Sequence, residues 1–428
     1  MSTSSPDVVA RPDAAASSRP RVVLGVGGGI AAYKACELLR RLTESGHDVR
    51  VIPTASALEF VGAATFEALS GHPVHTGVFH DVHEVPHVRL GQQAELVVVA
   101  PATADLLSRA AHGRADDLLT ATLLTARCPV LLAPAMHTEM WLHPATADNV
   151  ALLRSRGAVV LEPASGRLTG ADTGPGRLPD PAEVAALATL LLERADALPQ
   201  DLVGRHVLVS AGGTREPLDP VRFLGNRSSG KQGYALARVA AQRGARVTLV
   251  SGHTAGLAAP AAVDVVQVGT AAELREVVHA HARTADVVVM AAAVADFRPT
   301  TVESSKIKKG ADEPSSVPLT RNADVLAELV EARAAGRLPA EQVVVGFAAE
   351  TGDERGDVLT HARAKLARKG CDLLVVNAVG EGGAFEVDTN TGWLLGSDGS
   401  EQALDHGSKA LLATRVLDAV RARLAPPR

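Results

Sequence analysis

Short apolar runs alternate with stretches of helical periodicity along most of the chain. In the first half the runs are RVVLGV (21–26), DVRVIP (48–53), ELVVVA (95–100) and CPVLLA (128–133). Each has the length of a strand and little polar alternation, as in a parallel sheet whose two faces are both covered by helices. Stretches such as IAAYKACELLRRL (30–42), with apolar residues three and four positions apart, indicate the helices between them. The pattern predicts a doubly wound α/β domain.

The same pattern starts again after residue 204. HVLVSA (206–211), ARVTLVS (245–251), DVVVMAAA (286–293), QVVVGFAA (342–349) and CDLLVVN (371–377) are further strand-like runs, and 228–244 has helical periodicity. A chain of 428 residues is also too long for one core. We therefore expect two doubly wound, mainly parallel domains, the first flavodoxin-like and the second Rossmann-like. The expected division is a disordered tail 1–20, a first domain 21–190, a linker 191–204 and a second domain 205–428.

Composition and charge argue against nucleic-acid-binding, membrane-spanning and disulfide-rich proteins. A net charge of −5 gives no electrostatic reason to expect nucleic acid as a partner. No apolar run approaches the ~20 residues of a membrane-spanning helix, and the first twenty residues lack the cationic start and apolar core of a signal peptide. The three cysteines are scattered, which argues against a disulfide framework. We expect a cytoplasmic protein without a membrane partner.

Ligands of open parallel sheets bind beyond the carboxyl ends of the strands. After the first strand, Gly27, Gly28 and Gly29 precede a helix start, where free N–H groups favour an anion. A nicotinamide dinucleotide site is disfavoured, because Ile30 stands where its fingerprint needs glycine and Thr54 comes after the second strand in place of an acidic residue. From this stretch alone, a tight turn that binds no ligand remains an alternative. Short polar side chains at later strand ends indicate a mononucleotide cleft; they are Thr54, Ser56, Thr103 and Asp105.

Five motifs in this half resemble the homo-oligomeric flavin-containing cysteine decarboxylases. They are GGGIAAYK, TASA, APATAD, PAM followed by MW, and GPGRL, in that order. The resemblance implies FMN bound at the strand ends, a PAM loop that closes over the substrate, and FMN placed between subunits of a trimer. The FMN contacts that it implies are Gly28, Gly29, Ile30, Ala31, Thr54, Ser56, Thr103, Asp105 and Met136.

The chemistry of such a site needs a base, a carboxylate clamp and a proton donor, while the flavin provides the electron sink. The resemblance implies that His87, in PHVRLG, is the base. Residues 72–87 hold five histidines, so composition alone selects none of them. A metal site is the alternative for this cluster, although its irregular spacing fixes no coordination geometry.

The chain departs from the family pattern in two places. The family motif reads PxMNxxMW, so His137 replaces the asparagine that would hold the substrate carboxylate. Histidine can still donate hydrogen bonds, and we expect His137 to take this role. The family also carries a reactive cysteine on a flap before GPGR, where this chain has Gly170; we expect another group to donate the proton. Simple core filling remains an alternative for Met140.

In the second half, 221–233 (VRFLGNRSSGKQG) invites interpretation as a phosphate-binding P-loop. Gly225, Gly230 and Lys231 fit that motif, but Gln232 stands where a serine or threonine should meet magnesium. Pro217 and Pro220 also interrupt the strand that should precede it. A P-loop is therefore disfavoured.

A longer set of motifs resembles phosphopantothenate–cysteine ligase. SAGGTREPLDPVRFLGNRSSGKQG, AAAVADFRP, KIKK, RNADVL and VGFAAET occur in order over 210–351. The resemblance implies activation of a carboxylate by CTP to an acyl-cytidylate, which Asn226 would stabilise, and then attack by the amine of cysteine. Gly212, Gly213 and Thr214, at an expected strand–helix junction, could cradle phosphate through backbone N–H groups. Lys306, Lys308 and Lys309 could neutralise phosphate charge from a mobile loop, with a solvated charge cluster as the alternative.

The resemblance completes the CTP site with Ala292, Asp296, Ala323, Asp324, Val325, Leu326, Phe347, Lys365 and Lys369. Asp296 and backbone groups near Ala292 would read the cytosine. Mg²⁺ should accompany the triphosphate, without an assignable protein ligand. Asp219 and Asp324 could instead be ordinary helix caps or turns.

The two resemblances together describe the bifunctional coenzyme A biosynthesis proteins of bacteria. This implies that the chain joins 4′-phosphopantothenate to L-cysteine and then decarboxylates the product to 4′-phosphopantetheine. Two alternatives remain: a working ligase fused to an impaired flavin-binding regulatory domain, and an NAD(P)-dependent oxidoreductase, which Ile30 and Thr54 disfavour.

Overall fold

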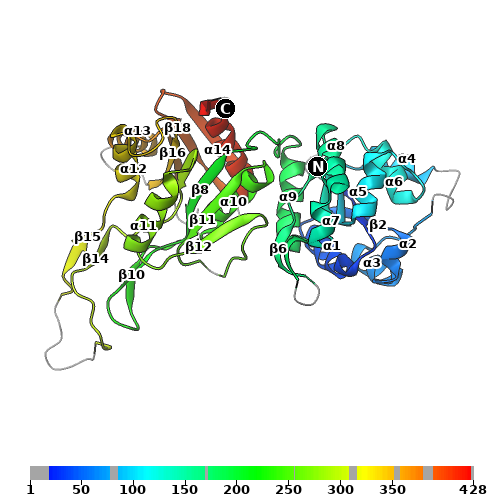
Figure 1. Cartoon of the computed structure of the whole chain (residues 1–428), viewed down its shortest axis with the longest axis horizontal. Helices are drawn as coiled ribbons and strands as arrows, with labels where there is room; N and C mark the ends of the chain where they lie inside the picture. The colour runs from blue at the N-terminus through cyan, green and yellow to red at the C-terminus, as the bar shows by residue number, and fades with distance from the viewer. Residues whose placement is uncertain are drawn as a thin grey trace, which may run out of the picture.

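The computed structural model describes residues 19–77, 85–168, 172–254, 256–307, 316–350, 357–378 and 389–425. Two α/β halves lie side by side along the long axis of the molecule (Figure 1). The first half contains a five-stranded sheet and the second an eight-stranded sheet. Among the described residues, no helix is both long enough and apolar enough to cross a bilayer.

The sheet of the first half is entirely parallel. Its order is β2-β1-β3-β4-β5, the flavodoxin-like order, which confirms the predicted fold class. The strands are β1 (Arg21–Val26), β2 (Asp48–Pro53), β3 (Leu96–Ala102), β4 (Val130–Pro134) and β5 (Val159–Val160). Because consecutive side chains point to opposite faces, Val22 and Leu24 pack with one layer of helices and Val23 with the other.

The helices of this half form those two layers. One layer contains α1 (Tyr33–Glu44), α3 (Ala63–Ser70) and α9 (Pro181–Glu193); the other contains α5 (Ala104–Ala111), α6 (Leu118–Thr125) and α8 (Pro144–Ser155). Short helices α2 (Ala55–Leu58) and α7 (Thr138–Leu142) come after strand ends, and α4 (Pro86–Gln93) packs on α6. The antiparallel hairpin β6 (Ala164–Arg167) and β7 (Thr173–Arg177) packs against α7.

The second sheet is parallel except at one edge. Its order is β12-β11-β8-β13-β16-β17-β18-β19, with antiparallel pairing only from β17 onward. The strands are β8 (His206–Ala211), β11 (Arg246–Ser251), β12 (Val263–Gln267), β13 (Val287–Met290), β16 (Val343–Glu350), β17 (Leu373–Ala378), β18 (Thr389–Gly396) and β19 (Glu401–Ser408). The five predicted strands of this half form its parallel centre.

Helices cover both faces of this sheet as well. α10 (Lys231–Gln242) and α14 (Lys409–Arg423) pack on the face turned to the first half; α11 (Ala271–Ala282), α12 (Val325–Ala334) and α13 (Val358–Lys369) pack on the other. Two small hairpins stand apart from the sheet: β9 (Arg215–Pro217) with β10 (Phe223–Gly225), and β14 (Phe297–Pro299) with β15 (Leu319–Arg321). They project from the lower left of Figure 1.

Helix α9 joins the two halves. It packs against α1 of its own half and α14 of the other, and one apolar cluster runs through all three helices. Hydrogen bonds reinforce the junction: the backbone N–H of Glu162 donates to Gln242 at 2.9 Å, and Ala261 N–H donates to the buried Glu183. Burial raises the pKa of Glu183 against the opposing effect of Arg238. The halves therefore share one continuous interior.

Arg243, at the end of α10, carries a buried charge at this junction. Its side chain is 1% exposed and donates to Asp201 at 2.5 and 2.8 Å and to Asp418 at 2.8 Å. Asp201 lies between the halves in sequence and Asp418 lies on α14. The guanidinium thus ties three separate segments together.

We predict that Arg243→Gln destabilises the protein by about 2–4 kcal/mol, because two partly buried carboxylates lose their cation. Urea unfolding should show an earlier transition. The exposed Arg246→Gln is the control and should change stability by no more than about 0.5 kcal/mol. Equal transitions for the two variants would contradict the role of Arg243.

Candidate active sites

The first half has a cavity of about 980 Å³ at the carboxyl ends of β1, β3 and β4. Every residue predicted to contact FMN lies on its wall, and so does His137. The predicted residues on the wall are Gly28, Gly29, Ile30, Ala31, Thr54, Ser56, Thr103, Asp105, Met136 and His137. Segments from residue 27 to residue 178 therefore meet at one site.

Close backbone approach explains the glycine cluster after β1. The N–H of Gly27 donates to the carbonyl of Pro101 at 3.0 Å, and a Cβ on Gly27 would lie 2.5 Å from that oxygen. A Cβ on Gly28 would lie 2.3 Å from the Cβ of Ser56. A side chain at either position would push the strand-end loops apart. Beyond them Ile30, 75% exposed, begins a 3₁₀ turn that leads into α1.

The two predicted threonines cap helices as well as lining the cavity. Thr54 Oγ1 accepts from Ala57 N–H at 3.2 Å, and Thr103 Oγ1 accepts from Leu106 N–H at 3.3 Å. Each oxygen accepts, so each hydroxyl can still donate to a ligand. Asp105, in the first turn of α5, lies 3.7 Å from Arg109, a cavity residue that the sequence did not indicate.

The PAM loop divides its large side chains between core and cavity. Met136 and Trp141 pack against an apolar cluster of the first half. Met140 is 46% exposed and lies on the cavity wall, so core filling, the alternative for this residue, is wrong. The short helix α7 turns Met140 away from the sheet. His137 precedes α7, and its exposed side chain reaches the same wall.

The β6–β7 hairpin forms the wall next to this loop. Met136 N–H donates to the carbonyl of Gly176 at 2.9 Å, and Gly176 has φ +145. Arg167 and Arg177 of the hairpin line the cavity and add positive charge that the sequence analysis did not assign. Gly170, the position of the family's flap cysteine, lies outside the described residues.

His87 does not lie on this wall. It stands in the first turn of α4, and its carbonyl accepts from Thr125 Oγ1 at 2.7 Å. Its Nδ1 is buried and finds no hydrogen-bond partner among the described residues. Of the neighbouring histidines, His72 pairs with Asp48 at 2.5 Å, and His80 and His83 are outside the described residues. No group of three His, Cys, Asp or Glu side chains in the described part of the chain is placed to hold a metal.

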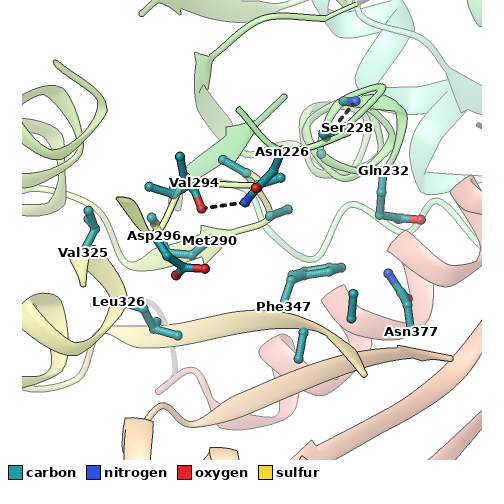
Figure 2. Close-up of a pocket in the computed structure, with 18 of the residues that line it drawn as sticks. Asn226, Ser228, Gln232, Met290, Val294, Asp296, Val325, Leu326, Phe347 and Asn377 are labelled. Atoms are coloured by element: carbon teal, nitrogen blue, oxygen red, sulfur yellow. Dashed lines mark hydrogen bonds between the residues drawn. The ribbon is translucent and has the colours of Figure 1, made fainter. Parts of the chain in front are cut away.

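The second half has a cavity of about 1150 Å³ between the start of α10 and the ends of β13, β16 and β17 (Figure 2). Ten of the residues that the sequence assigned to the CTP reaction lie on its wall: Asn226, Ala292, Asp296, Ala323, Asp324, Val325, Leu326, Phe347, Lys365 and Lys369. A cavity of this size holds a nucleotide with room for a second ligand.

Hydrogen bonds from two asparagines shape the segment after β13. Asn226 Nδ2 donates to the carbonyl of Val294 at 3.0 Å, a bond drawn in Figure 2, and Asn322 Nδ2 donates to the carbonyl of Ala295 at 2.8 Å. Asn322 N–H also donates to the carbonyl of Asp296 at 2.8 Å. The carboxylate of Asp296 is therefore held on an ordered backbone at the cavity edge.

Asp324 acts as a helix cap. Its side chain accepts from Ala327 N–H at 3.2 Å at the start of α12, and it pairs with Lys369 of α13. Burial raises the pKa of Asp324, but the hydrogen bond from Lys369 and other contacts outweigh it and the pKa is lowered. Asp219 likewise accepts three backbone N–H groups, from Val221, Arg222 and Ile307, as a turn residue does.

The predicted phosphate cradle at Gly212, Gly213 and Thr214 is not supported by its geometry. The turn leads into the hairpin strand β9 and not into a helix. Gly213 N–H donates to His253 and Thr214 N–H donates to Ala293, at 3.1 and 3.3 Å, so neither amide is available to a phosphate. Gly213 and Thr214 line a separate cavity of about 490 Å³ that shares Asn226 with the larger one.

The predicted lysines differ in placement. Lys306 is exposed and lies on none of the three cavity walls, while Lys308 and Lys309 are outside the described residues. One end of the large cavity received no ligand from the sequence: Lys231 and Gln232 were named only in the rejected P-loop, and Asn377, Asn390 and Lys409 were not assigned. The signals for this end were the stretch 221–233 and the position of Asn377 at the end of the strand-like run 371–377.

Comparison with known proteins defines the class. The Flavoprotein family model matches residues 11–192, and the model of the DNA/pantothenate metabolism flavoprotein C-terminal domain matches residues 202–424. The chain thus joins a flavoprotein domain to a second domain found with it in pantothenate metabolism.

Full-length relatives identify the family. The chain is 74% identical over 408 residues to the coenzyme A biosynthesis bifunctional protein CoaBC of Mycolicibacterium smegmatis, covering 95% of this chain and 99% of the relative. It is 42% identical over 404 residues to the Bacillus subtilis protein of that name, covering 94% and 96%. The chain belongs to the bifunctional coenzyme A biosynthesis enzymes, which combine phosphopantothenoylcysteine decarboxylase and phosphopantothenate–cysteine ligase domains.

Solved structures resemble each half separately. The crystal structure of a CoaBC C-terminal domain is 36% identical and covers 52% of this chain and 97% of its own, with a TM-score of 0.43. The FMN-dependent cysteine decarboxylase SpaF is 37% identical and covers 38% and 91%, with a TM-score of 0.34.

We predict that Gly176→Ala loosens the hairpin from the PAM loop and releases flavin. A Cβ there would lie 2.3 Å from the carbonyl of Met136, and φ +145 disfavours a side chain. Flavin fluorescence in the filtrate after ultrafiltration measures the loss. Gly157→Ala is the control, because it also has positive φ but no atom within 4 Å. Equal flavin retention in both variants would contradict the role of this contact.

Proposed function

We propose that the second half ligates 4′-phosphopantothenate to L-cysteine with CTP, and that the first half decarboxylates the product to 4′-phosphopantetheine with FMN. The main support is that all the residues assigned from sequence to FMN line one cavity, and ten of those assigned to the CTP reaction line the other. These residues are spread over 109 and 144 positions, from 28 to 136 and from 226 to 369.

The ligase reaction begins with attack of the phosphopantothenate carboxylate on the α-phosphate of CTP, which gives an acyl-cytidylate and pyrophosphate. Asp296 and the backbone near Ala292 read the cytosine. The N-terminus of α10, with Lys231, takes the phosphate role expected of Gly212, Gly213 and Thr214, because the residues that begin this helix line the cavity and a helix N-terminus favours an anion. Mg²⁺ accompanies the triphosphate, and Lys306, Lys308 and Lys309 compensate its charge. Asn226 stabilises the acyl-cytidylate until the cysteine amine displaces CMP.

A flavin fits the residues of the first cavity. Glycines allow close approach, Thr54 and Thr103 offer hydroxyl donors, and Ile30 and Met136 offer apolar surface. Bound FMN supplies an electron sink for the cysteinyl thiol, so that carbon dioxide can leave. The protein's own groups then have two tasks: His137 holds the carboxylate, and His87 takes the proton.

The position of His87 supports an oligomeric site. Since His87 lies off the wall of its own cavity, we propose that a second copy brings it to the flavin, in a homo-oligomer built on trimers. Co-expression of His87→Asn subunits with Gly28→Ala subunits tests this. Mixed oligomers should regain decarboxylation that neither parent has, and no recovery would contradict the shared site.

We predict that His87→Asn abolishes carbon dioxide release from 4′-phosphopantothenoylcysteine and leaves ligation intact, because only the decarboxylase loses its base. Gas release and ligase turnover are measured on one preparation. The control is His112→Asn, an exposed histidine at the end of α5. Wild-type rates of release in the His87 variant would refute its role. Absence of release in the unmodified enzyme would favour the regulatory flavin domain instead.

We predict that Asn226→Asp slows product formation about 100-fold or more, the scale seen when one transition-state hydrogen-bond donor is removed. Single-turnover pyrophosphate release without cysteine should be affected far less, because Asn226 acts after activation. Asn149→Asp, on α8 outside all three cavities, is the matched control. Parallel loss of pyrophosphate and product would place Asn226 in the first step.

A further inference from the structure

We propose that Asn322, in the loop between β15 and α12, is the positioning residue that sets the preference of the ligase cavity for cytosine over uracil. It acts through Asp296, which reads the base. The inference therefore rests on the proposed ligase reaction and deepens it. In Figure 2 the Asp296 side chain lies on the same side of the cavity as Val325 and Leu326, where α12 begins.

A carboxylate can distinguish these two bases only if it is held in one place. Cytosine carries an amino group where uracil carries a carbonyl oxygen, so a carboxylate accepts a hydrogen bond from the first and repels the second. In the described part of the chain, no hydrogen bond or ion pair engages the Asp296 carboxylate. Its position therefore depends on the backbone that carries it.

Asn322 holds the two carbonyls on either side of the Asp296 α-carbon. Its Nδ2 donates to the carbonyl of Ala295 at 2.8 Å, and its backbone N–H donates to the carbonyl of Asp296 at 2.8 Å. This contact continues the β14–β15 hairpin, in which Phe297 lies opposite Arg321. Because peptide units are planar, fixing both of them restrains the direction of the Cα–Cβ bond of Asp296.

Arg298 determines which end of the Asn322 amide faces Ala295. Its Nη1 donates to Asn322 Oδ1 at 2.8 Å and to the carbonyl of Arg321 at 3.2 Å. A guanidinium only donates, so the oxygen end of the amide faces Arg298 and the nitrogen end faces Ala295. Arg298 lies on β14, which starts directly after Asp296. One hairpin therefore carries both the residue that reads the base and the cation that orients its support.

Thr214 holds the same segment from its other end. The N–H of Ala295 donates to Thr214 Oγ1 at 3.0 Å, and Thr214 is 1% exposed. Asn226 holds the preceding carbonyl, that of Val294, at 3.0 Å. Both backbone groups of Ala295 are thus bound by side chains from segments far apart in sequence. Such a set of bonds is expected where a neighbouring side chain must keep one direction.

The test compares CTP with UTP as the activating nucleotide. Asn322→Asp keeps the oxygen that Arg298 binds and replaces the donor to Ala295 with a second acceptor. We expect the ratio of kcat/KM for CTP to kcat/KM for UTP to fall about tenfold or more, because a charge-assisted hydrogen bond to the base is misplaced. The matched control, Asn149→Asp, should leave this ratio unchanged.

Two further variants separate positioning from general damage. Thr214→Val removes the hydroxyl that binds Ala295, so the ratio should fall in the same direction, and this variant carries the test if Asn322→Asp does not fold. In an Asp296→Ala background, Asn322→Asp should change the ratio by less than about twofold, because no carboxylate is left to position. Thermal unfolding of every variant is measured in parallel.

The outcomes are distinct. A fall in the ratio that disappears in the Asp296→Ala background supports the positioning role. Equal losses with both nucleotides, or an unchanged ratio in folded Asn322→Asp enzyme, overturn it, and equal use of CTP and UTP by the unmodified enzyme does so as well. Pyrophosphate release from CTP and phosphopantothenate without cysteine tests the ligase reaction separately, and its absence would overturn that reaction together with this role.

Discussion

The apolar contact of α9 with α1 on one side and α14 on the other holds this molecule together. Each half could bury its own sheet, but α9 completes a core cluster that belongs to both. If α9 shifted, apolar surface would be exposed to water at its contacts with both α1 and α14. This exposure costs roughly 25 cal/mol for each Å². The junction therefore fixes the two halves relative to each other, and the hydrogen bonds of Glu183, Glu193 and Arg243 give it a specific register.

Both cavities result from one rule of parallel sheets, namely that ligands meet the carboxyl ends of the strands. They differ in the loops that extend beyond those strand ends. In the first half, glycines and capping threonines leave a cleft with hydroxyl donors and apolar edges. In the second, asparagines hold a polar backbone segment, and lysines from α13 and α14 supply charge. The same architecture thus serves a flavin in one half and a ligase reaction in the other.

Much of the parallel framework could be predicted from sequence. Runs such as 21–26 and 206–211 are apolar on both faces, and the structure gives them the predicted bounds as β1 and β8. The short hairpins were missed because their strands are three to five residues long and carry little apolar pattern. The turn at Gly212 was misjudged for the same reason, since nothing local indicates that β9 comes after it.

The residues of the two sites could likewise be predicted only in part. Residues at strand ends were found because the topology of the sheet brings them together. Asn377 and Asn390 were missed because their contact depends on the antiparallel pairing of β17 with β18, which a local apolar pattern does not indicate. Met140 was assigned an alternative core role because a methionine beside a strand favours burial, and only α7 turns it outward.

The hydrogen bond from Ser408 to Glu193 joins the ligase half to the last helix of the first half, so it is lost when the two halves are separated. A fragment that starts at β8 keeps every strand of the ligase sheet but loses the Glu193 carboxylate, which accepts hydrogen bonds from Ser408, the N-cap residue of α14. Its terminal helix would begin without these hydrogen bonds, next to Lys409, which lines the large cavity. The ligase half on its own therefore lacks hydrogen bonds at the start of α14 that it has in the intact chain.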